Sequence, residues 1–244
     1  MDGIIDIHSH ILPGLDDGSR SLEQTLSMIG IAYSEGIRTI IATPHYQESK
    51  VSNPIARIEE SIGIVNEAIA MSYPDMKLYM GSEIYYSQDI GALLNDKLIP
   101  TLAGSKYILV EFSPMSDYRY IKEGLHSLVL EGYIPILAHC ERYIEATRDI
   151  SRVEELISMG VYIQVNSMSI DGSTGRDYEK FTKKLLKRKL VHFIATDSHS
   201  DRTRAPSVGK TIAYINKKYG EAYTKQLLTD NPGRIITGQY IYTI

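Results

Sequence analysis

The sequence has little cysteine, no tryptophan and no long apolar run. Cys140 is the only cysteine in 244 residues, so no disulfide can form within the chain, and this usage fits a reducing compartment. No apolar run approaches the roughly 20 residues that a membrane-spanning helix requires. The chain does not begin with a basic region followed by an apolar run, so we expect no signal peptide. The sequence therefore predicts a cytoplasmic protein without membrane insertion.

An excess of positive charge is also missing. Lys and Arg number 26 against 30 Asp and Glu, and the net charge of −4 indicates no basic surface for nucleic acid. Hydrophobic residues make up 43% of the chain, which is enough for a sizeable core. We find no linker, low-complexity stretch or internal repeat, so we expect a single domain over residues 1–244. The pattern makes no prediction of the oligomeric state.

Short apolar runs alternate with amphipathic stretches along the whole chain. The expected strands span 4–10, 38–43, 76–86, 107–112, 134–139, 161–166 and 191–196, and the expected helices span 21–36, 54–71, 120–131, 151–159, 177–189, 206–219 and 221–229. Short apolar strands between helices are typical of a parallel sheet covered by helices. Seven such units predict an α/β fold with a closed or nearly closed TIM-like barrel. An open doubly wound sheet is the alternative, but its G-x-G-x-x-G phosphate loop is missing.

The first expected strand ends in two histidines. Residues i and i+2 of a strand point to the same side, so His8 and His10 share a face, and Asp6 is expected behind them on that face. Two imidazoles so placed can bind one metal ion, although two histidines packed by hydrogen bonds are the alternative. The turn that follows adds the carboxylates of Asp16 and Asp17. Either can be the ligand, and we choose Asp17, just before the glycine.

Further metal-binding residue types recur at the ends of the other expected strands. The carboxyl ends of barrel strands are where active sites lie. Burying so many unpaired ionisable groups would be costly, and metal ions remove that cost. Imidazole and carboxylate ligands suit Mn, Fe or Zn, and the size of the set fits two or three ions. The predicted ligands are His8, His10, Asp17, His45, Glu83, Glu111, His139, Asp197 and His199, whereas His126 and His192 are interpreted as structural.

The charge balance of this set points to an anionic substrate. Three divalent ions bring +6 and the four carboxylates −4, which leaves about +2 and favours a phosphate group. Arg142 and Arg204 follow predicted ligands on the same rim and are candidates to hold phosphate oxygens bidentately. The alternative for each arginine is a surface salt bridge.

Eight short motifs occur in an order that resembles a known family. They are His8-Ser9-His10, Asp16-Asp17-Gly18, Pro44-His45, Gly81-Ser82-Glu83-Ile84-Tyr85-Tyr86, Val110-Glu111-Phe112-Ser113, Ala138-His139-Cys140-Glu141-Arg142-Tyr143, Gln164-Val165-Asn166-Ser167 and Thr196-Asp197-Ser198-His199. From about residue 4 to Pro232 the chain resembles the polymerase-and-histidinol-phosphatase (PHP) superfamily. Within it, the chain is similar to the bacterial manganese-dependent protein-tyrosine phosphatases of capsule and exopolysaccharide operons.

The resemblance implies a distorted seven-stranded (β/α) barrel with a trinuclear site. It implies that His8, His10, Glu83 and Asp197 hold a first metal, that Glu83, Glu111 and His139 hold a second, and that Asp17, His45 and His199 hold a third. Arg142 and Arg204 match the family's phosphate-binding arginines. The implied substrate is phosphotyrosine on a bacterial tyrosine autokinase.

Other functions are compatible with parts of the pattern. A PHP-family enzyme for a small phosphate ester such as histidinol phosphate has the same metal set. An amidohydrolase also begins with His-x-His, but it commonly has a lysine where Glu111 stands here. A non-enzymatic regulator is expected to have lost ligands. A cysteine-nucleophile phosphatase is excluded because the chain has no Cys-x5-Arg signature.

Tyrosines near the expected strand ends are candidates to stack on a phosphotyrosine ring. Ordinary packing is the alternative for each of them. The five candidates are Tyr46, Tyr85, Tyr86, Tyr118 and Tyr143.

Overall fold

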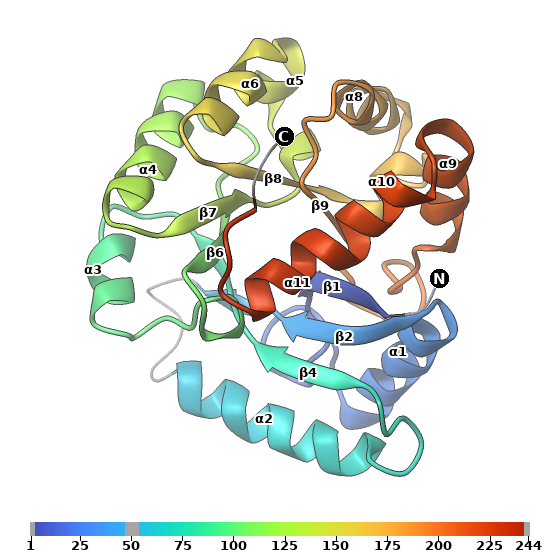
Figure 1. Ribbon diagram of the computed structural model, residues 1–244. Helices are drawn as coiled ribbons and strands as arrows, with labels where there is room; N and C mark the ends of the chain where they lie inside the picture. Colours follow the sequence, from blue (N-terminus) through green and yellow to red (C-terminus); the bar gives the residue numbers. More distant parts are fainter. Residues whose placement is uncertain (1–2, 47–53, 242–244) are drawn as a thin grey trace.

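Parallel strands form the centre of the molecule (Figure 1). The computed structural model describes residues 3–46 and 54–241. One sheet has the order β1-β2-β4 and the other the order β3-β5-β6-β7-β8-β9. The strands are β1 (Ile4–Ser9), β2 (Ile37–Ala42), β3 (His45–Tyr46), β4 (Lys77–Met80), β5 (Glu83–Tyr85), β6 (Tyr107–Glu111), β7 (Ile134–Leu137), β8 (Tyr162–Asn166) and β9 (Phe193–Ala195).

The sheets curl until their first and last strands meet. Ser9, the last residue of β1, forms a parallel bridge with Ser198, which follows β9. The His10 amide donates to the Ser198 carbonyl at 2.9 Å, and the Asp197 amide donates to the His8 carbonyl at 2.8 Å. The predicted α/β class with a parallel sheet is therefore confirmed, in the form of a curled sheet.

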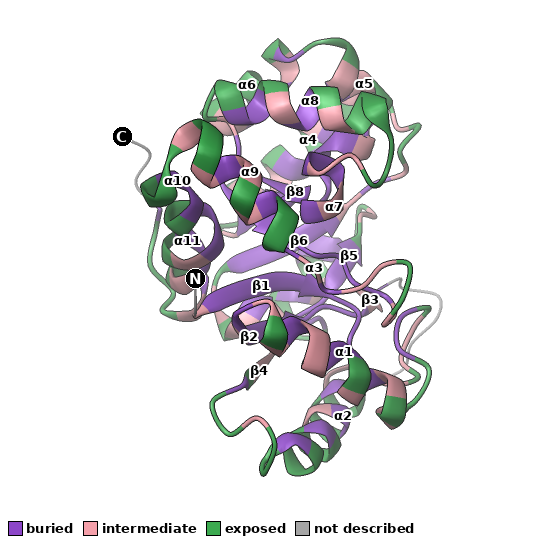
Figure 2. Ribbon diagram, turned by 90° about the vertical axis from the view of Figure 1, so that its right-hand side faces the viewer, coloured by how far each residue is buried: buried purple, intermediate pink, exposed green. Residues whose placement is uncertain are grey.

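Helices cover the outer face of the strands and bury them (Figure 2). They are α1 (Leu22–Ser34), α2 (Pro54–Ile69), α3 (Ile90–Asn95), α4 (Tyr118–Leu130), α5 (Ile144–Arg148), α6 (Ser151–Ser158), α7 (Ser167–Ile170), α8 (Arg176–Lys187), α9 (Gly209–Tyr219), α10 (Glu221–Lys225) and α11 (Asn231–Ile236), with short turns η1 (Leu102–Gly104), η2 (Cys140–Arg142) and η3 (Gln226–Asp230). The short α3, α5 and α7 were not predicted. Among the described residues, no helix is both long and apolar enough to cross a membrane.

Alternation along the strands separates two apolar layers. On β6, Ile108 and Val110 belong to the layer between sheet and helices, whereas Tyr107 and Leu109 belong to a second layer inside the curl. Ile235 of α11 also belongs to the inner layer. This period of two is what a strand covered on both faces requires.

The carboxyl-terminal segment closes the amino ends of the strands. In Figure 1, α10 and α11 lie across the ring of strands. The Tyr107 hydroxyl donates to the Gln239 carbonyl at 2.9 Å, and the Tyr162 hydroxyl donates to the Ile241 carbonyl at 2.8 Å. The carboxyl ends lie on the opposite side, which leaves them free to build a site.

The third predicted strand, over 76–86, is wrong as a single element. It divides into β4, which pairs with β2, and β5, which pairs with β6. The chain changes sheets at Gly81, where a Cβ atom would lie only 2.8 Å from Leu102 Cδ2 and 2.9 Å from Ile41 Cγ2. Any other residue here would have to displace these two side chains, so glycine permits the close approach. The division, together with the short β3, makes the strand pattern differ from the seven predicted runs.

The last expected helix, over 221–229, is too short. The chain remains helical from α10 through the π-helical turn η3 into α11, and Pro232 lies in the first turn of α11. Proline is tolerated there because the first helical amides lack intrahelical partners.

Candidate metal centre

An irregularity in β1 places His8 and His10 inside the curl. Asp6 pairs with Ile40, and Ser9 pairs with Ala42, so three steps on β1 oppose two on β2. The extra residue changes the alternation, as in a β-bulge. The expected position of Asp6 on the histidine face is therefore wrong, because its partner Ile40 belongs to the outer layer. The Asp6 carboxylate instead accepts the Thr196 amide at 3.0 Å.

Strand register brings three further predicted ligands together. His45 on β3 pairs with Glu83 on β5, and Tyr85 on β5 pairs with Glu111 at the end of β6. His45 Nδ1 lies 3.0 Å from Glu83 Oε2 and 3.1 Å from Glu111 Oε1. Paired residues of parallel strands point to one face, so these three side chains meet above the inner apolar layer.

Glu83 is shared among several histidines. Its Oε2 atom lies 3.2 Å from Nε2 of both His8 and His10, and its Oε1 atom lies 2.8 Å from His139 Nε2. The side chain is almost completely buried. A carboxylate whose two oxygens face different imidazoles has the geometry of a bridging ligand.

Two of the residues that follow the strands have left-handed backbone conformations. His139 has φ 33° and ψ 57° just after β7, and Asp197 has φ 51° just after β9. Such conformations are uncommon for residues other than glycine and cluster at functional sites. They turn the chain sharply where each strand ends.

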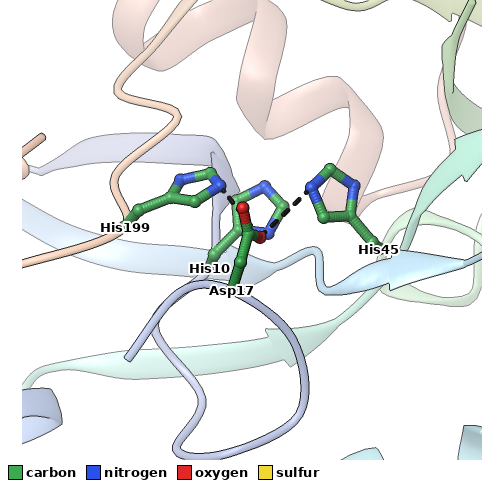
Figure 3. A group of neighbouring side chains, drawn as sticks. All are labelled: His10, Asp17, His45 and His199. Atoms are coloured by element: carbon green, nitrogen blue, oxygen red, sulfur yellow. Dashed lines mark ion pairs between the residues drawn. The ribbon is translucent and has the colours of Figure 1, made fainter. Parts of the chain in front are cut away.

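Eight of the nine predicted ligands fall into three overlapping groups. The first group is His8, His10 and Asp197, the second is His45, Glu83 and Glu111, and the third is His10, Asp17, His45 and His199; within each group the ligand atoms lie within 4.8 Å of one another. The ninth residue, His139, joins them through Glu83. Figure 3 shows the third group, with Asp17 between His45 and His199.

The two neighbouring aspartates have different positions. Asp17 Oδ1 lies 3.4 Å from His45 Nε2 and 3.5 Å from His199 Nε2, inside the third group. Asp16 Oδ2 instead accepts a hydrogen bond from His10 Nδ1 at 2.6 Å and from the His45 amide at 3.0 Å. Asp16 thus orients two imidazole-bearing residues from behind, while Asp17 faces the centre of the group.

Three of the histidines are held in the protonated form by carboxylates. Burial disfavours the charged imidazole of His10, but the hydrogen bonds that it donates to Asp16 and Glu83 outweigh this effect and raise the pKa of His10 to about 9. The same balance, with the glutamates as partners, raises the pKa of His45 to about 11 and that of His139 to about 9. The cluster therefore attracts positive charge strongly.

The buried carboxylates Glu83 and Asp197 stay ionised. Burial opposes ionisation of Glu83, yet the surrounding histidines hold its pKa well below its usual range. Burial likewise opposes ionisation of Asp197, but the neighbouring His8 and the Arg142 guanidinium lower its pKa. The pKa of His199 shifts in the opposite direction from those of the other three histidines. Burial and the nearby charge of His10 lower it to about 4.

Both predicted phosphate-binding arginines contact Asp197. Arg142 Nη2 lies 2.7 Å from Asp197 Oδ2, and Arg204 Nη2 lies 2.6 Å from Asp197 Oδ1. The two guanidinium groups are about one-third exposed, whereas the carboxylate is buried. The arginines therefore lie on the open side of the cluster and reach into it.

A polar pair on β8 supports the cluster and was not predicted to have a role. Gln164 Oε1 accepts the His139 amide at 2.7 Å and lies 3.2 Å from His8 Nδ1. Because a backbone amide can only donate, this atom is the amide oxygen, so His8 Nδ1 carries the proton and Nε2 is free to bind a metal. Gln164 Nε2 donates to Asn166 Oδ1 at 2.8 Å, and Asn166 Nδ2 donates to Asp197 Oδ2 at 2.8 Å.

The only cysteine takes no part in the cluster. Cys140 is fully buried in the outer apolar layer, and burial raises the pKa of its thiol far above the usual range. A thiolate nucleophile is therefore incompatible with the environment of Cys140.

His192, interpreted from the sequence as structural, is buried as well, and its Nδ1 accepts a hydrogen bond from the Ile163 amide at 3.1 Å.

Known proteins resemble the chain over almost its whole length. The family model described as capsular polysaccharide synthesis, CpsB/CapC, matches residues 4–237. The chain is 39% identical to the tyrosine-protein phosphatase CpsB of Streptococcus pneumoniae, over 98% of this chain and 100% of that protein. It is 32% identical to the tyrosine-protein phosphatase YwqE of Bacillus subtilis, over 98% of this chain and 94% of that protein.

Solved structures agree with the sequence matches. One solved chain comes from the structures of YwqE from Bacillus subtilis and CpsB from Streptococcus pneumoniae, described as unique metal-dependent tyrosine phosphatases. It matches with a TM-score of 0.91 at 32% identity, over 98% of this chain and 96% of that chain. Histidinol phosphate phosphatase from Lactococcus lactis gives a TM-score of 0.57 at 15% identity, covering 89% of this chain and 94% of that chain. The second likeness shows a shared fold alone.

Proposed function

The chain belongs to the CpsB/CapC family of capsular polysaccharide synthesis, and from this membership we propose that it is a metal-dependent protein-tyrosine phosphatase. The observation that carries the proposal is the convergence of nine imidazole and carboxylate side chains at the carboxyl ends of the strands. Relatives that match 98% of the chain are tyrosine-protein phosphatases, and a structural relative is metal-dependent.

The donor set fits two or three divalent ions, with Mn as the first choice and Fe or Zn as alternatives. It contains five imidazoles and four carboxylates and no thiolate. The attraction for positive charge, seen in the raised pKa values of His10, His45 and His139, supports cations at this place. We assign His8, His10, Glu83 and Asp197 to one ion, Glu83, Glu111 and His139 to a second, and Asp17, His45 and His199 to a third.

The residues of the chain have separate roles in phosphate hydrolysis. When bound, the ions supply charge that stabilises the phosphoryl group and lowers the pKa of an attacking water molecule. Arg142 and Arg204 hold phosphate oxygens with their planar guanidinium groups, which match an oxyanion bidentately. Gln164 holds His8 in the tautomer that a metal requires. The leaving phenolate, with a pKa near 10, needs less assistance than an alkoxide.

The protein substrate and its setting are a further part of the proposal. We infer that the substrate is a phosphotyrosine of a bacterial tyrosine autokinase, that the enzyme acts in the cytoplasm, and that it regulates capsular or exopolysaccharide synthesis. The curled parallel sheet supports the assignment of the fold to the distorted seven-stranded barrel of PHP type. The second candidate is a PHP-family phosphoesterase for a small ester such as histidinol phosphate.

A substrate comparison with and without metal tests the proposal. The Mn-loaded protein should hydrolyse a phosphotyrosine peptide with a higher kcat/KM than histidinol phosphate. Chelation should lower the activity by at least about 1000-fold, equivalent to roughly 4 kcal/mol in the barrier, and Mn should restore it. Full activity in the metal-free protein would refute the metal-dependent mechanism. A preference for histidinol phosphate would favour the second candidate.

A further inference from the structure

The structure distinguishes one tyrosine from the other four predicted near the rim. Tyr46 and Tyr143 are buried. The Tyr86 ring stacks on Phe112 in the outer layer, with ring centroids 4.8 Å apart. The Tyr118 hydroxyl donates to the Arg152 carbonyl at 3.0 Å on the helical side. Among these five residues, Tyr85 alone is well exposed, over 37% of its surface.

The strand register places Tyr85 directly beside the metal centre. Glu83 and Tyr85 are two residues apart on β5, so they share a face, whereas Ile84 between them belongs to the outer layer. Tyr85 pairs with Glu111 across the sheet, and the amide of the next residue donates to the Glu111 carbonyl at 2.9 Å. The Tyr85 ring therefore follows the ligand row on the interior face, one step farther toward the open end.

Exposed apolar side chains continue on the same side of the rim. Met115 and Ile144 follow β6 and β7, and they are 76% and 36% exposed. The Ile144 amide donates to the Pro114 carbonyl at 3.2 Å, which holds the two loops together. Two arginines lie beside these side chains: Arg142 follows β7, Arg204 follows β9, and both contact Asp197. The rim thus has exposed apolar side chains at β5 to β7 and a pair of cationic groups at Asp197.

This division matches the two parts of an aryl phosphate. We propose that Tyr85 forms the wall of an aryl subsite and packs against the phenyl ring of phosphotyrosine. The phosphate then lies on the histidine–carboxylate cluster, between it and the arginines. An aromatic ring takes up a second ring in an offset or edge-to-face arrangement, which an alkyl group cannot reproduce. The inference rests on the proposed phosphatase function and adds the residue that selects aryl over alkyl phosphates.

Binding of two phosphonates tests the subsite without relying on turnover. Phenylphosphonate and methylphosphonate share the anionic group and differ in the ring. In the Mn-loaded protein, Tyr85→Ala should weaken phenylphosphonate binding by about 3- to 12-fold in calorimetry and leave methylphosphonate unchanged. Tyr85→Phe should bind both like the unaltered protein, because it keeps the ring.

Tyr178 provides a matched control, since it is also 37% exposed but lies on α8. Tyr178→Ala should change the binding of neither phosphonate. Equal weakening of both phosphonates by Tyr85→Ala, or no weakening of either, would overturn the aryl subsite. A protein that shows the ring-dependent binding but cannot hydrolyse a phosphotyrosine peptide would refute the phosphatase function and leave the subsite standing.

Discussion

The two ends of the strands carry different chemistry on the same interior face. On β6, Leu109 lies in the inner apolar layer and Glu111, two residues later, lies in the ligand cluster. On β9 and the turn after it, Ala195 lies in the apolar layer and Asp197 lies in the cluster. The amino end is closed by α11, and the carboxyl end is open to the arginines. One strand therefore serves stability at its beginning and chemistry at its end.

The difference shows where this fold can accept strain. The apolar end gains free energy from burial, at about 25 cal/mol for each Å² of apolar surface. The polar end buries ionisable groups and holds His139 and Asp197 in left-handed conformations, both of which cost free energy. Left-handed residues also precede β6 and β9, at Lys97, Ala103 and Lys189, but at the carboxyl end the strain falls on residues whose side chains belong to the cluster.

The largest expected effect comes from exchanging single residues at the two ends of β6. Glu111→Gln should lower kcat/KM on a phosphotyrosine peptide by about 1000-fold, because a metal ligand and its charge are lost. Its metal-free form should unfold at a modestly lower denaturant concentration, because burial and Glu83 oppose ionisation of Glu111 but hydrogen bonds with His139 and His45 outweigh them and lower its pKa. Leu109→Ala should instead lower the free energy of unfolding by about 2–5 kcal/mol.

The activity of each folded Leu109→Ala molecule should stay close to that of the unaltered protein. Kinetics at a temperature where the variant is folded, together with denaturant unfolding, measure both quantities. If Leu109→Ala lost activity as strongly as Glu111→Gln while folded, the two ends of the strand would not be separable.

The next effect concerns the arginines on the open side. Arg142→Ala or Arg204→Ala should lower kcat/KM by about 30- to 1000-fold, because a charge-assisted contact to phosphate is lost in a partly dry site. Lysine should rescue poorly, since its ammonium cannot reproduce the planar guanidinium. Both arginines also contact Asp197, so the Mn content must be measured with the kinetics. Loss of Mn would assign them to holding the carboxylate; unchanged kinetics would contradict phosphate binding.

The sequence was most informative about which residues gather at the carboxyl end. The type of a residue and its position at the end of an apolar run can both be read from the local sequence. His45, Glu111 and His139 are recognised as candidate ligands from these two features. The nine predicted ligands converge in the structure for that reason. The choice of Asp17 over Asp16 rested only on the adjacent glycine, and the structure places Asp17 at the centre of the third group.

Features that depend on contacts between distant segments were not predictable. The β1 irregularity that turns His8 inward depends on pairing with β2, and the division at Gly81 depends on the approach of Leu102. The left-handed conformation of Asp197 could not be predicted from the residue type, because aspartate tolerates this conformation but seldom adopts it. A signal for Gln164 was present, because Gln164 and Asn166 place polar groups two residues apart on an apolar strand.

A smaller effect should follow from removing the support beneath His8. Gln164→Leu removes the acceptor that fixes the His8 tautomer and the contact to the His139 amide. The affinity for Mn should fall by about 10- to 100-fold, as for other residues that orient metal ligands. Gln164→Glu keeps an acceptor and should retain more affinity. Equal affinities in Gln164→Leu and the unaltered protein, measured by calorimetry, would contradict the supporting role.

The last expected effect is that of pH on metal binding at the polar end. Between about pH 6.5 and 9, His10 and His139 are protonated in the metal-free protein because their pKa values are raised to about 9, and His45 follows with a pKa of about 11. A metal binds only the neutral imidazole, so each displaced proton should strengthen Mn binding by about tenfold for each pH unit gained.

Folding of the metal-free protein should show the opposite trend. A raised pKa in the folded state stabilises the fold below the unfolded value near 6.5, and this stability is lost as the pH rises toward 9. The buried carboxyl groups of Asp6 and Glu141, whose pKa values burial raises, act in the same direction. Thermal unfolding should therefore give a Tm that falls with pH after chelation, and a stabilisation by Mn that grows with pH. Parallel slopes for the two forms would show that the ions do not replace these protons.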